Sequence, residues 1–169
     1  MNRFRVLTVC TANVCRSPAA AAVLAAAVDE AGLSDSVEVG SAGTTWEAEG
    51  MPMDDRTAAA LQRAGHRADL HAARTVHVNE LAQWDLVLAM TLNHRETLQR
   101  QVEAAPELCA GTEVRMWGAF DPAMPEGATG SDLDVPDPWY EDDPAFDEMV
   151  ARLERAVPSL LDAIRSRLD

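Results

Sequence analysis

Strand-like and helix-like segments alternate along the whole chain. The strand-like segments are 6–9, 36–43, 85–90 and 113–117. Apolar runs such as those within 6–9 and 85–90 are typical of strands that are buried on both faces of a parallel sheet. Helical periodicity fills the intervals between these strands. The sequence therefore predicts an α/β fold, a single-domain four-stranded parallel sheet with helices on both faces and right-handed crossovers.

The ends of the first two helices are marked in the sequence. The first begins with Ser17 as an N-cap and Pro18 as the first helical residue, and Gly32 ends it. The second begins at a cap formed by 54–55 and ends at Gly65. Its predicted inner face contains Ala58, Ala59 and Leu61.

Three further helices are predicted in the second half of the chain. A short one covers 78–84, and a longer one is capped by Thr91 and ends before Pro106. The last begins at 143–144, and Pro158 within it predicts a kink or a break at or just before that residue. Its apolar face consists of Phe146, Met149, Val150, Leu153, Val157, Leu160, Leu161 and Ile164.

The stretch 119–143 shows no periodicity and is rich in Pro, Gly, Asp and Met. This composition predicts a long surface loop, and loops of this length commonly carry function. Its carboxylates include Asp132, Asp134, Asp137, Glu141, Asp142 and Asp143. We expect most of them to be solvated.

Length, charge and cysteine content narrow the classes of protein to which the chain can belong. A chain of 169 residues, 47% of them hydrophobic, is sized for one domain, 1–169, with a single core. The net charge of −14, with every basic residue an arginine, argues against nucleic acid as a partner. Three cysteines do not form an even disulfide framework, and no apolar stretch is long enough to span a bilayer. We therefore expect a cytoplasmic protein without membrane insertion.

The main chemical signal lies between the first strand and the first helix, where five residues separate Cys10 from Arg16 and Ser17 follows. A loop between a strand end and a helix N-terminus can direct its backbone N–H groups at an anion. Those groups and Arg16 would favour a nucleophilic thiolate at Cys10, and the guanidinium can grip two oxygens of a tetrahedral oxyanion. The pattern predicts a phosphate-binding loop with a nucleophile at its base, rather than a small cysteine merely buried at a strand end.

Segments 9–18 and 135–140 together closely resemble the low molecular weight protein tyrosine phosphatases. The family's intervening blocks are matched, in the same order, by 41–44, 50–56, 71–74 and 85–90. The resemblance spans nearly the whole chain. It implies the family's fold, with the phosphate-binding loop after the first strand, and the hydrolysis of phosphotyrosine in proteins and of small aryl phosphates.

The resemblance implies roles for individual residues. Cys10 attacks phosphorus to form a phosphocysteine intermediate, Arg16 clamps the phosphate, and Asp137 acts as general acid and then as general base. Trp46 lies at the carboxyl end of a predicted strand, where open α/β sheets bind their ligands, and would help to wall a slot for an aromatic ring. No metal or other cofactor is implied. The implied substrate-binding residues are Thr11, Ala12, Asn13, Val14, Cys15, Ser17, Trp46, Trp139 and Tyr140.

The same resemblance implies support for the loop and sensitivity to oxidants. Ser41 and His71 would brace Asn13 from behind, and asparagine tolerates a left-handed backbone. Cys15 would pair reversibly with Cys10 under oxidants, which makes the nucleophile a redox-sensitive cysteine.

Other functions on the same loop stay open. Arginine phosphatases carry a threonine where this chain has Val14, and the aliphatic side chain favours phosphotyrosine. Thioredoxin-coupled arsenate reductases use two further cysteines in the second half of the chain, where only Cys109 occurs. A phosphotyrosine-binding module without catalysis would usually lack the nucleophile or the acid, and Cys10 and Asp137 are both present.

The expected partner is therefore a phosphotyrosine-containing protein, with a tyrosine kinase as a second candidate partner, and we expect a monomer. Three positions depart from the family's common pattern: Ala12 replaces a glycine, Ala21 a glutamate and Thr91 an aspartate. None of these departures removes a chemical group that the mechanism needs.

Overall fold

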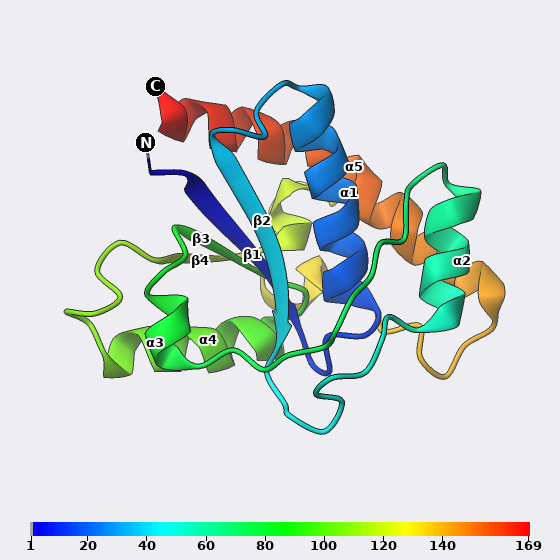
Figure 1. Cartoon of the computed structure of the whole chain (residues 1–169), viewed down its shortest axis with the longest axis horizontal. Helices are drawn as coiled ribbons and strands as arrows, with labels where there is room; N and C mark the ends of the chain where they lie inside the picture. Colours follow the sequence, from blue (N-terminus) through cyan, green and yellow to red (C-terminus); the bar gives the residue numbers. More distant parts are fainter. Residues whose placement is uncertain (1) are drawn as a thin grey trace.

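The computed structural model describes residues 2–169 and contains one parallel sheet between two layers of helices (Figure 1). The strands are β1 (Phe4–Cys10), β2 (Val37–Gly43), β3 (Leu86–Ala89) and β4 (Glu113–Met116), in the order β2-β1-β3-β4. The helices are α1 (Arg16–Glu30), α2 (Asp55–Arg63), α3 (Val78–Leu81), α4 (Leu92–Ala104) and α5 (Asp143–Leu168). Two short 3-10 helices are η1 (Trp117–Phe120) and η2 (Gly130–Leu133).

The central strand β1 fixes the register of the sheet. It pairs with β2 from Phe4 opposite Val37 to Cys10 opposite Gly43, and its other edge pairs with β3. All strand pairs are parallel, so the carboxyl ends of the strands lie at the same edge of the sheet. Cys10 therefore ends β1 beside the end of β2.

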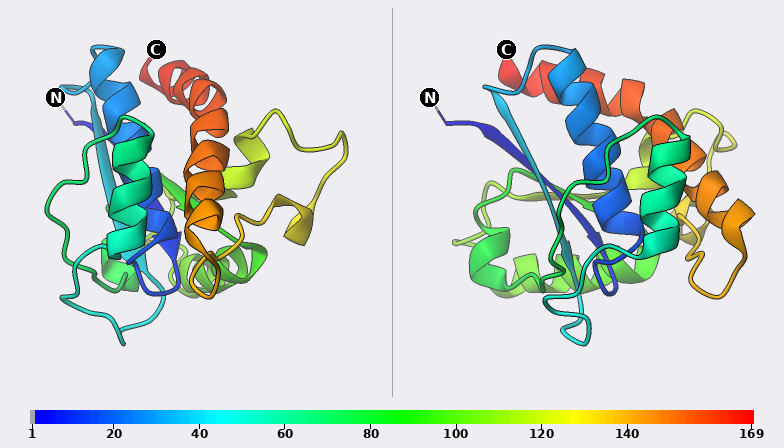
Figure 2. Two further views of the ribbon diagram at one scale, coloured as in Figure 1. Left: turned by 90° about the vertical axis from the view of Figure 1, so that its right-hand side faces the viewer. Right: turned by 45° about the vertical axis from the view of Figure 1, so that its right-hand side comes forward.

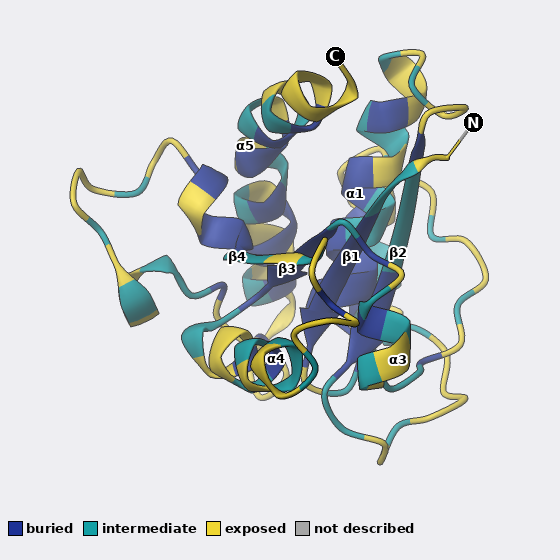
Figure 3. Cartoon of the chain, turned by 90° about the vertical axis from the view of Figure 1, so that its left-hand side faces the viewer, coloured by how far each residue is buried: buried dark blue, intermediate teal, exposed yellow. Residues whose placement is uncertain are grey.

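The strands divide the core into two clusters, one on each face of the sheet. Val6 belongs to the cluster beneath α1, α2 and α5, whereas Leu7 belongs to the cluster beneath α3 and α4. This division follows from the strand geometry, because successive side chains of a strand point to opposite faces. Figure 3 shows the buried strands between helices whose outer faces are exposed. The predicted four-stranded parallel sheet with helices on both faces is confirmed.

Several helix ends agree with the sequence and one does not. Gly32 and Gly65 follow α1 and α2 with φ values of 69° and 86°, the left-handed conformation that commonly ends a helix. The predicted N-cap at Ser17 is wrong, because α1 already begins at Arg16 and Ser17 lies inside the first turn. Pro18 is consequently the third helical residue, where its missing N–H still costs no intrahelical bond.

Two predictions about helix faces and continuity need correction. The buried residues of α2 are Thr57, Ala60 and Leu61, and the predicted Ala58 and Ala59 are only partly buried. The predicted break at Pro158 is absent, since α5 continues through it. The strands and α3 end within three residues of the predicted positions.

The loop between η1 and α5 is attached to the body at a few points and projects from it on one side (Figure 2). Arg155 on α5 pairs with the buried Asp121 at 2.9 Å. Arg152 donates to the Asp134 backbone oxygen at 2.7 Å, and the Asp134 carboxylate accepts the Leu92 N–H at the start of α4. These contacts direct the following segment, which contains Asp137, toward the carboxyl edge of the sheet.

Across residues 2–169, none of the helices has both the length and the apolar character that crossing a bilayer requires.

Candidate active site

The loop after β1 rests against the end of β2. The Cys10 and Thr11 carbonyls accept the backbone N–H groups of Thr44 and Thr45 at 3.0 and 3.1 Å. A Cβ atom at Gly43 would lie 2.6 Å from the Thr11 backbone oxygen, so only glycine allows the loop to pass this closely. The two strand ends and the loop therefore form one tightly packed unit.

Asn13 shapes this loop from a fully buried position. Its φ of 60° is left-handed, and no other non-glycine residue among 2–169 has a positive φ. Its side-chain amide nitrogen donates to the hydroxyls of Ser17 and Ser41 at 2.8 and 3.0 Å, and its amide oxygen accepts the Arg74 N–H at 3.1 Å. His71 Nε2 lies 2.7 Å from the Asn13 carbonyl, which can only accept, so Nε2 carries the proton. The structure thus brings Ser41 and His71 to Asn13.

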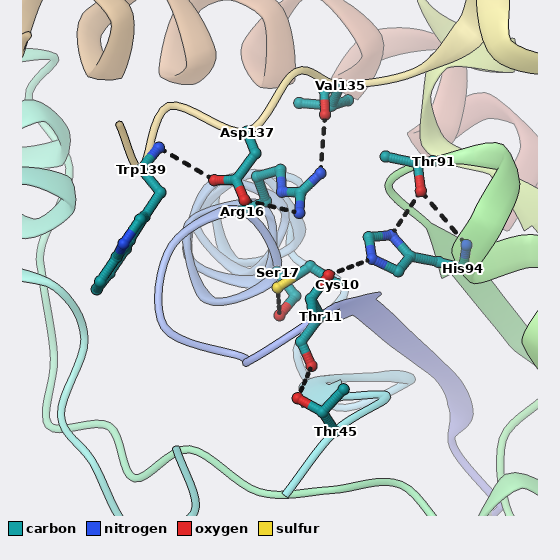
Figure 4. A network of polar contacts seen from close by, with 10 residues as sticks. All are labelled: Cys10, Thr11, Arg16, Ser17, Thr45, Thr91, His94, Val135, Asp137 and Trp139. Atoms are coloured by element: carbon teal, nitrogen blue, oxygen red, sulfur yellow. Dashed lines mark hydrogen bonds and ion pairs between the residues drawn. The ribbon is translucent and has the colours of Figure 1, made fainter. Parts of the chain in front are cut away.

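The Ser17 hydroxyl lies beside the sulfur of the buried Cys10, at 3.0 Å (Figure 4). It also lies 3.2 Å from the Ala42 carbonyl. It also accepts the amide of Asn13, so its single proton can go to only one of the other two neighbours. A Cys10 thiolate could only accept. Loss of the thiol proton would therefore shift the hydrogen bond that the Ser17 hydroxyl donates from the Ala42 carbonyl to the Cys10 sulfur. This engagement explains why Ser17 does not cap α1.

Arg16 joins this loop to a segment 121 residues further along the chain. The side chain is buried, and its guanidinium donates to the Val135 carbonyl at 3.2 Å and to Asp137 Oδ2 at 3.4 Å. The other carboxylate oxygen of Asp137 accepts the backbone N–H of Trp139 at 3.1 Å (Figure 4). About half of the Asp137 side chain remains accessible. The predicted nucleophile, cation and carboxylate are therefore gathered at one place.

A cavity of about 550 Å³ opens above these residues. The loop forms its floor, and Trp139 and Tyr140 lie in its wall. Asn13 and Ser17 lie beneath the floor and do not line it. Trp46 does not line it either, because the side chain is 73% exposed outside the cavity and its neighbours Glu47 and Ala48 take the predicted place. The remaining lining residues are Cys10, Thr11, Ala12, Val14, Cys15, Arg16, Met51, Pro52, Met53, Asp54, Asp55 and Asp137.

The second loop cysteine differs from the first in its surroundings. Cys15 is buried, and desolvation raises the pKa of its thiol to about 12. At neutral pH this side chain is consequently a thiol. Cys10, Cys15 and Cys109 are all free cysteines in the structure. Nowhere in the described chain do three or more His, Cys, Asp or Glu side chains gather in a way that could hold a metal ion.

The sequence did not point to His94, which the structure places against the loop. Its Nε2 lies 2.8 Å from the Thr11 hydroxyl, and its Nδ1 lies 3.0 Å from the hydroxyl of Thr91, the cap of α4. Burial and the positive charge of Arg16 lower the pKa of His94 to about 4, so the ring is neutral at pH 7. Its position one turn after the third strand, at the sheet edge that carries the loop, is the signal that could have identified it.

Arg56 is a second residue that the sequence did not single out. It lies in the first turn of α2 and contacts both Asp54 and the carbonyl of Trp139, two residues that line the cavity. Its place two residues after a helix cap gave no indication of the second contact.

Comparisons with known proteins agree with this geometry. The sequence model described as "Low molecular weight phosphotyrosine protein phosphatase" matches residues 5–168. The chain is 41% identical to a low molecular weight protein-tyrosine-phosphatase of Streptomyces coelicolor, over 98% of this chain and 96% of that protein. It is also 41% identical to low molecular weight protein-tyrosine phosphatase A of Mycobacterium tuberculosis, over 96% and 93% of the two chains.

Solved structures show the same fold. A protein tyrosine phosphatase from Entamoeba histolytica superposes with a TM-score of 0.84 at 24% identity, covering 96% of this chain and 97% of that one. Together, the family match over nearly the whole length and the curated relatives establish that this chain belongs to the low molecular weight phosphotyrosine protein phosphatase family and is a hydrolase.

Proposed function

We propose that the enzyme hydrolyses phosphotyrosine in proteins, and small aryl phosphates, through a phosphocysteine intermediate at Cys10. The observation that carries the proposal is the contact between Arg16 and Asp137, which brings a carboxyl group over the cavity floor formed by Cys10 and its loop. A nucleophile, a phosphate clamp and a proton donor then meet in one cavity, as phosphoryl transfer by covalent catalysis requires.

In the first step the Cys10 thiolate attacks phosphorus, so that an S–P bond forms while the bond from phosphorus to the phenolic oxygen breaks. Asp137 gives its proton to that oxygen, and the phenol leaves. In the second step the Asp137 carboxylate takes a proton from water, whose oxygen attacks phosphorus. The S–P bond breaks, which releases inorganic phosphate and restores the thiolate.

The negative charge of the transferring group is met by Arg16 and by backbone amides. The guanidinium fork is suited to two equatorial oxygens, and it would leave Asp137 for the phosphate on binding. Because α1 begins at Arg16, the N–H groups of its first turn have no intrahelical partners and are available to the anion. The neutral His94 adds no charge of its own to this region.

Phosphotyrosine is favoured over the alternatives by the cavity and by the third cysteine. Val14, in the cavity lining, presents an apolar side chain to the substrate, and Trp139 and Tyr140 offer aromatic surface to a phenyl ring. Cys109 is buried in the core cluster beneath α3 and α4, away from the cavity, and so is badly placed for an arsenate reductase relay. A cytoplasmic location, a monomeric state and a kinase partner remain predictions of the sequence.

Replacing Cys10 by serine tests the covalent step. Turnover of a phosphotyrosine peptide by Cys10→Ser should fall to background, because a serine hydroxyl is a far weaker nucleophile than a thiolate, while phosphate binding measured by calorimetry should persist. Cys109→Ser, the matched control, should keep wild-type turnover. Activity of Cys10→Ser above a few per cent of wild type contradicts the mechanism. Faster turnover of a phosphoarginine peptide, or of arsenate with thioredoxin, by the wild type contradicts the substrate assignment.

Replacing Asp137 by asparagine tests the proton donor. General acid catalysis is typically worth about 10²- to 10⁴-fold, and a poor leaving group depends on it most. In kcat/KM, which covers the steps up to departure of the leaving group but not the later hydrolysis of the phosphocysteine, Asp137→Asn should therefore lose about that factor on a phosphotyrosine peptide and much less on p-nitrophenyl phosphate. Asp142→Asn, in the same loop, should behave as wild type in steady-state assays of both substrates. Equal losses of kcat/KM on the two substrates would assign Asp137 a role other than proton donation.

We also propose that Cys15 protects the nucleophile. Peroxide would convert Cys10 to a sulfenic acid, and attack by Cys15 would form a disulfide with release of water. Cys15→Ser should regain less activity than wild type after peroxide and then dithiothreitol, with Cys109→Ser as the control. Since burial raises the pKa of Cys15 to about 12, its reactive thiolate becomes more abundant as pH rises toward that value, and disulfide formation should be faster at pH 9 than at pH 7. Equal recovery of the wild type and Cys15→Ser excludes this role.

A further inference from the structure

Arg56 links two segments that line the cavity, one just before α2 and one just after Asp137. Its Nε and Nη2 each lie 3.2 Å from a different oxygen of the Asp54 carboxylate, on the wall that precedes α2. Its remaining terminal nitrogen, Nη1, donates to the backbone carbonyl of Trp139 at 3.1 Å, on the wall that follows Asp137. One planar guanidinium group thus uses separate donors for Asp54 and for Trp139, which lies 83 residues beyond Arg56 in the chain.

The Asp54 end of this bridge is fixed to the phosphate-binding loop. The backbone N–H of Asp54 donates to the Val14 carbonyl at 2.9 Å, and the Asp54 carboxylate caps α2 by accepting the N–H groups of Arg56 and Thr57. The two-point contact restricts the guanidinium in both position and orientation. Arg56 therefore extends from a rigid part of the site.

The other end is held by aromatic rings as well as by the hydrogen bond. The guanidinium carbon lies 5.3 Å from the centre of the Trp139 ring and 4.5 Å from that of Phe146, which is fully buried on α5. Both distances are within the range of cation–π attraction. The Trp139 backbone is in turn bonded to the proposed acid, because its N–H donates to Asp137 Oδ1 at 3.1 Å (Figure 4).

The segment 136–141 has few other polar attachments. Among residues 2–169, only two hydrogen bonds join it to the rest of the chain: the one from Arg16 to Asp137 and the one from Arg56 to Trp139. The hydrogen bond from Arg16 to Asp137 must weaken when the Arg16 guanidinium group binds the phosphate. During the reaction, Arg56 would then provide the remaining hydrogen bond between this segment and the body of the protein.

We propose that Arg56 is a positioning residue for the general acid: by holding the Trp139 peptide, it keeps the Asp137 carboxyl group over the leaving oxygen. Arg56 does not line the cavity and touches no reacting atom. The inference rests on the proposed role of Asp137. It predicts that the contribution of Arg56 to the rate exists only while Asp137 can transfer a proton.

The test is a double-mutant cycle with Arg56→Met and Asp137→Asn, assayed on a phosphotyrosine peptide and on p-nitrophenyl phosphate. Methionine keeps a long apolar side chain at this position and removes the donors. Arg56→Met should lower kcat/KM on the peptide about 10-fold, which is less than the roughly 10²- to 10⁴-fold contribution of acid catalysis itself, and lower it by less than about 3-fold on p-nitrophenyl phosphate. In the Asp137→Asn background, Arg56→Met should have no further effect on kcat/KM for the peptide.

Arg63→Met is the matched control, because Arg63 also lies on α2 and also pairs with α5, through Asp147 at 2.8 Å. It should leave both rates unchanged. Arg56→Lys retains the positive charge but not the planar guanidinium group, and should show the same substrate pattern with smaller losses. It provides the test if Arg56→Met does not fold. Equal losses of kcat/KM on both substrates, or an undiminished loss in the Asp137→Asn background, would overturn the proposal. A normal peptide rate for Asp137→Asn alone would instead reject the acid assignment.

Discussion

The geometry of the site depends on one buried asparagine with a left-handed backbone. A left-handed conformation at a residue other than glycine costs roughly 1–2 kcal/mol. At Asn13 four hydrogen bonds oppose this cost, two from its amide nitrogen, one to its amide oxygen and one to its carbonyl. Each is worth about 1 kcal/mol net, so the strained turn is stable before any ligand arrives. The reversal at Asn13 is what lets five residues connect the end of β1 to the start of α1.

The sheet supplies the partners that this turn needs. Because β1 and β2 pair over their full length, Ser41 and Gly43 come to lie directly behind the loop. The segment between α2 and α3, residues 64–77, adds His71 and Arg74 as further partners of Asn13. An anion site formed in this way suits a protein with a net charge of −14, because the overall field repels phosphate and attraction must come from local geometry.

The sequence predicted the parts of the site that depend on local order. The strand before Cys10, the loop of five residues and the helix after Arg16 follow one another in the chain, and the structure contains all three. The resemblance to the family supplied the more distant residues, Asp137 among them, and the structure brings Asp137 to Arg16.

What the sequence predicted wrongly, or did not predict, depends on contacts between distant segments. The Ser17 hydroxyl suits an N-cap, but contacts with Cys10 and Asn13 engage it. α5 continues through Pro158 because the apolar residues on either side of the proline remain packed in the core. Trp46 lies in the loop that follows β2, and no periodic pattern in the sequence predicts the path of such a loop. His94 and Arg56 act through neighbours from other elements, and neither lies in a motif of its own.

The most direct test of the account is identification of the residue that carries the phosphoryl group. Asp137→Asn should form the intermediate from p-nitrophenyl phosphate, whose leaving group needs little protonation, and hydrolyse it slowly because the general base is missing. After rapid quenching, mass spectrometry should find one phosphoryl group on the peptide that contains Cys10, bound to sulfur. A phosphoryl group on Ser17 or on any other residue, or no covalent adduct while the variant is turning over, would contradict the central claim.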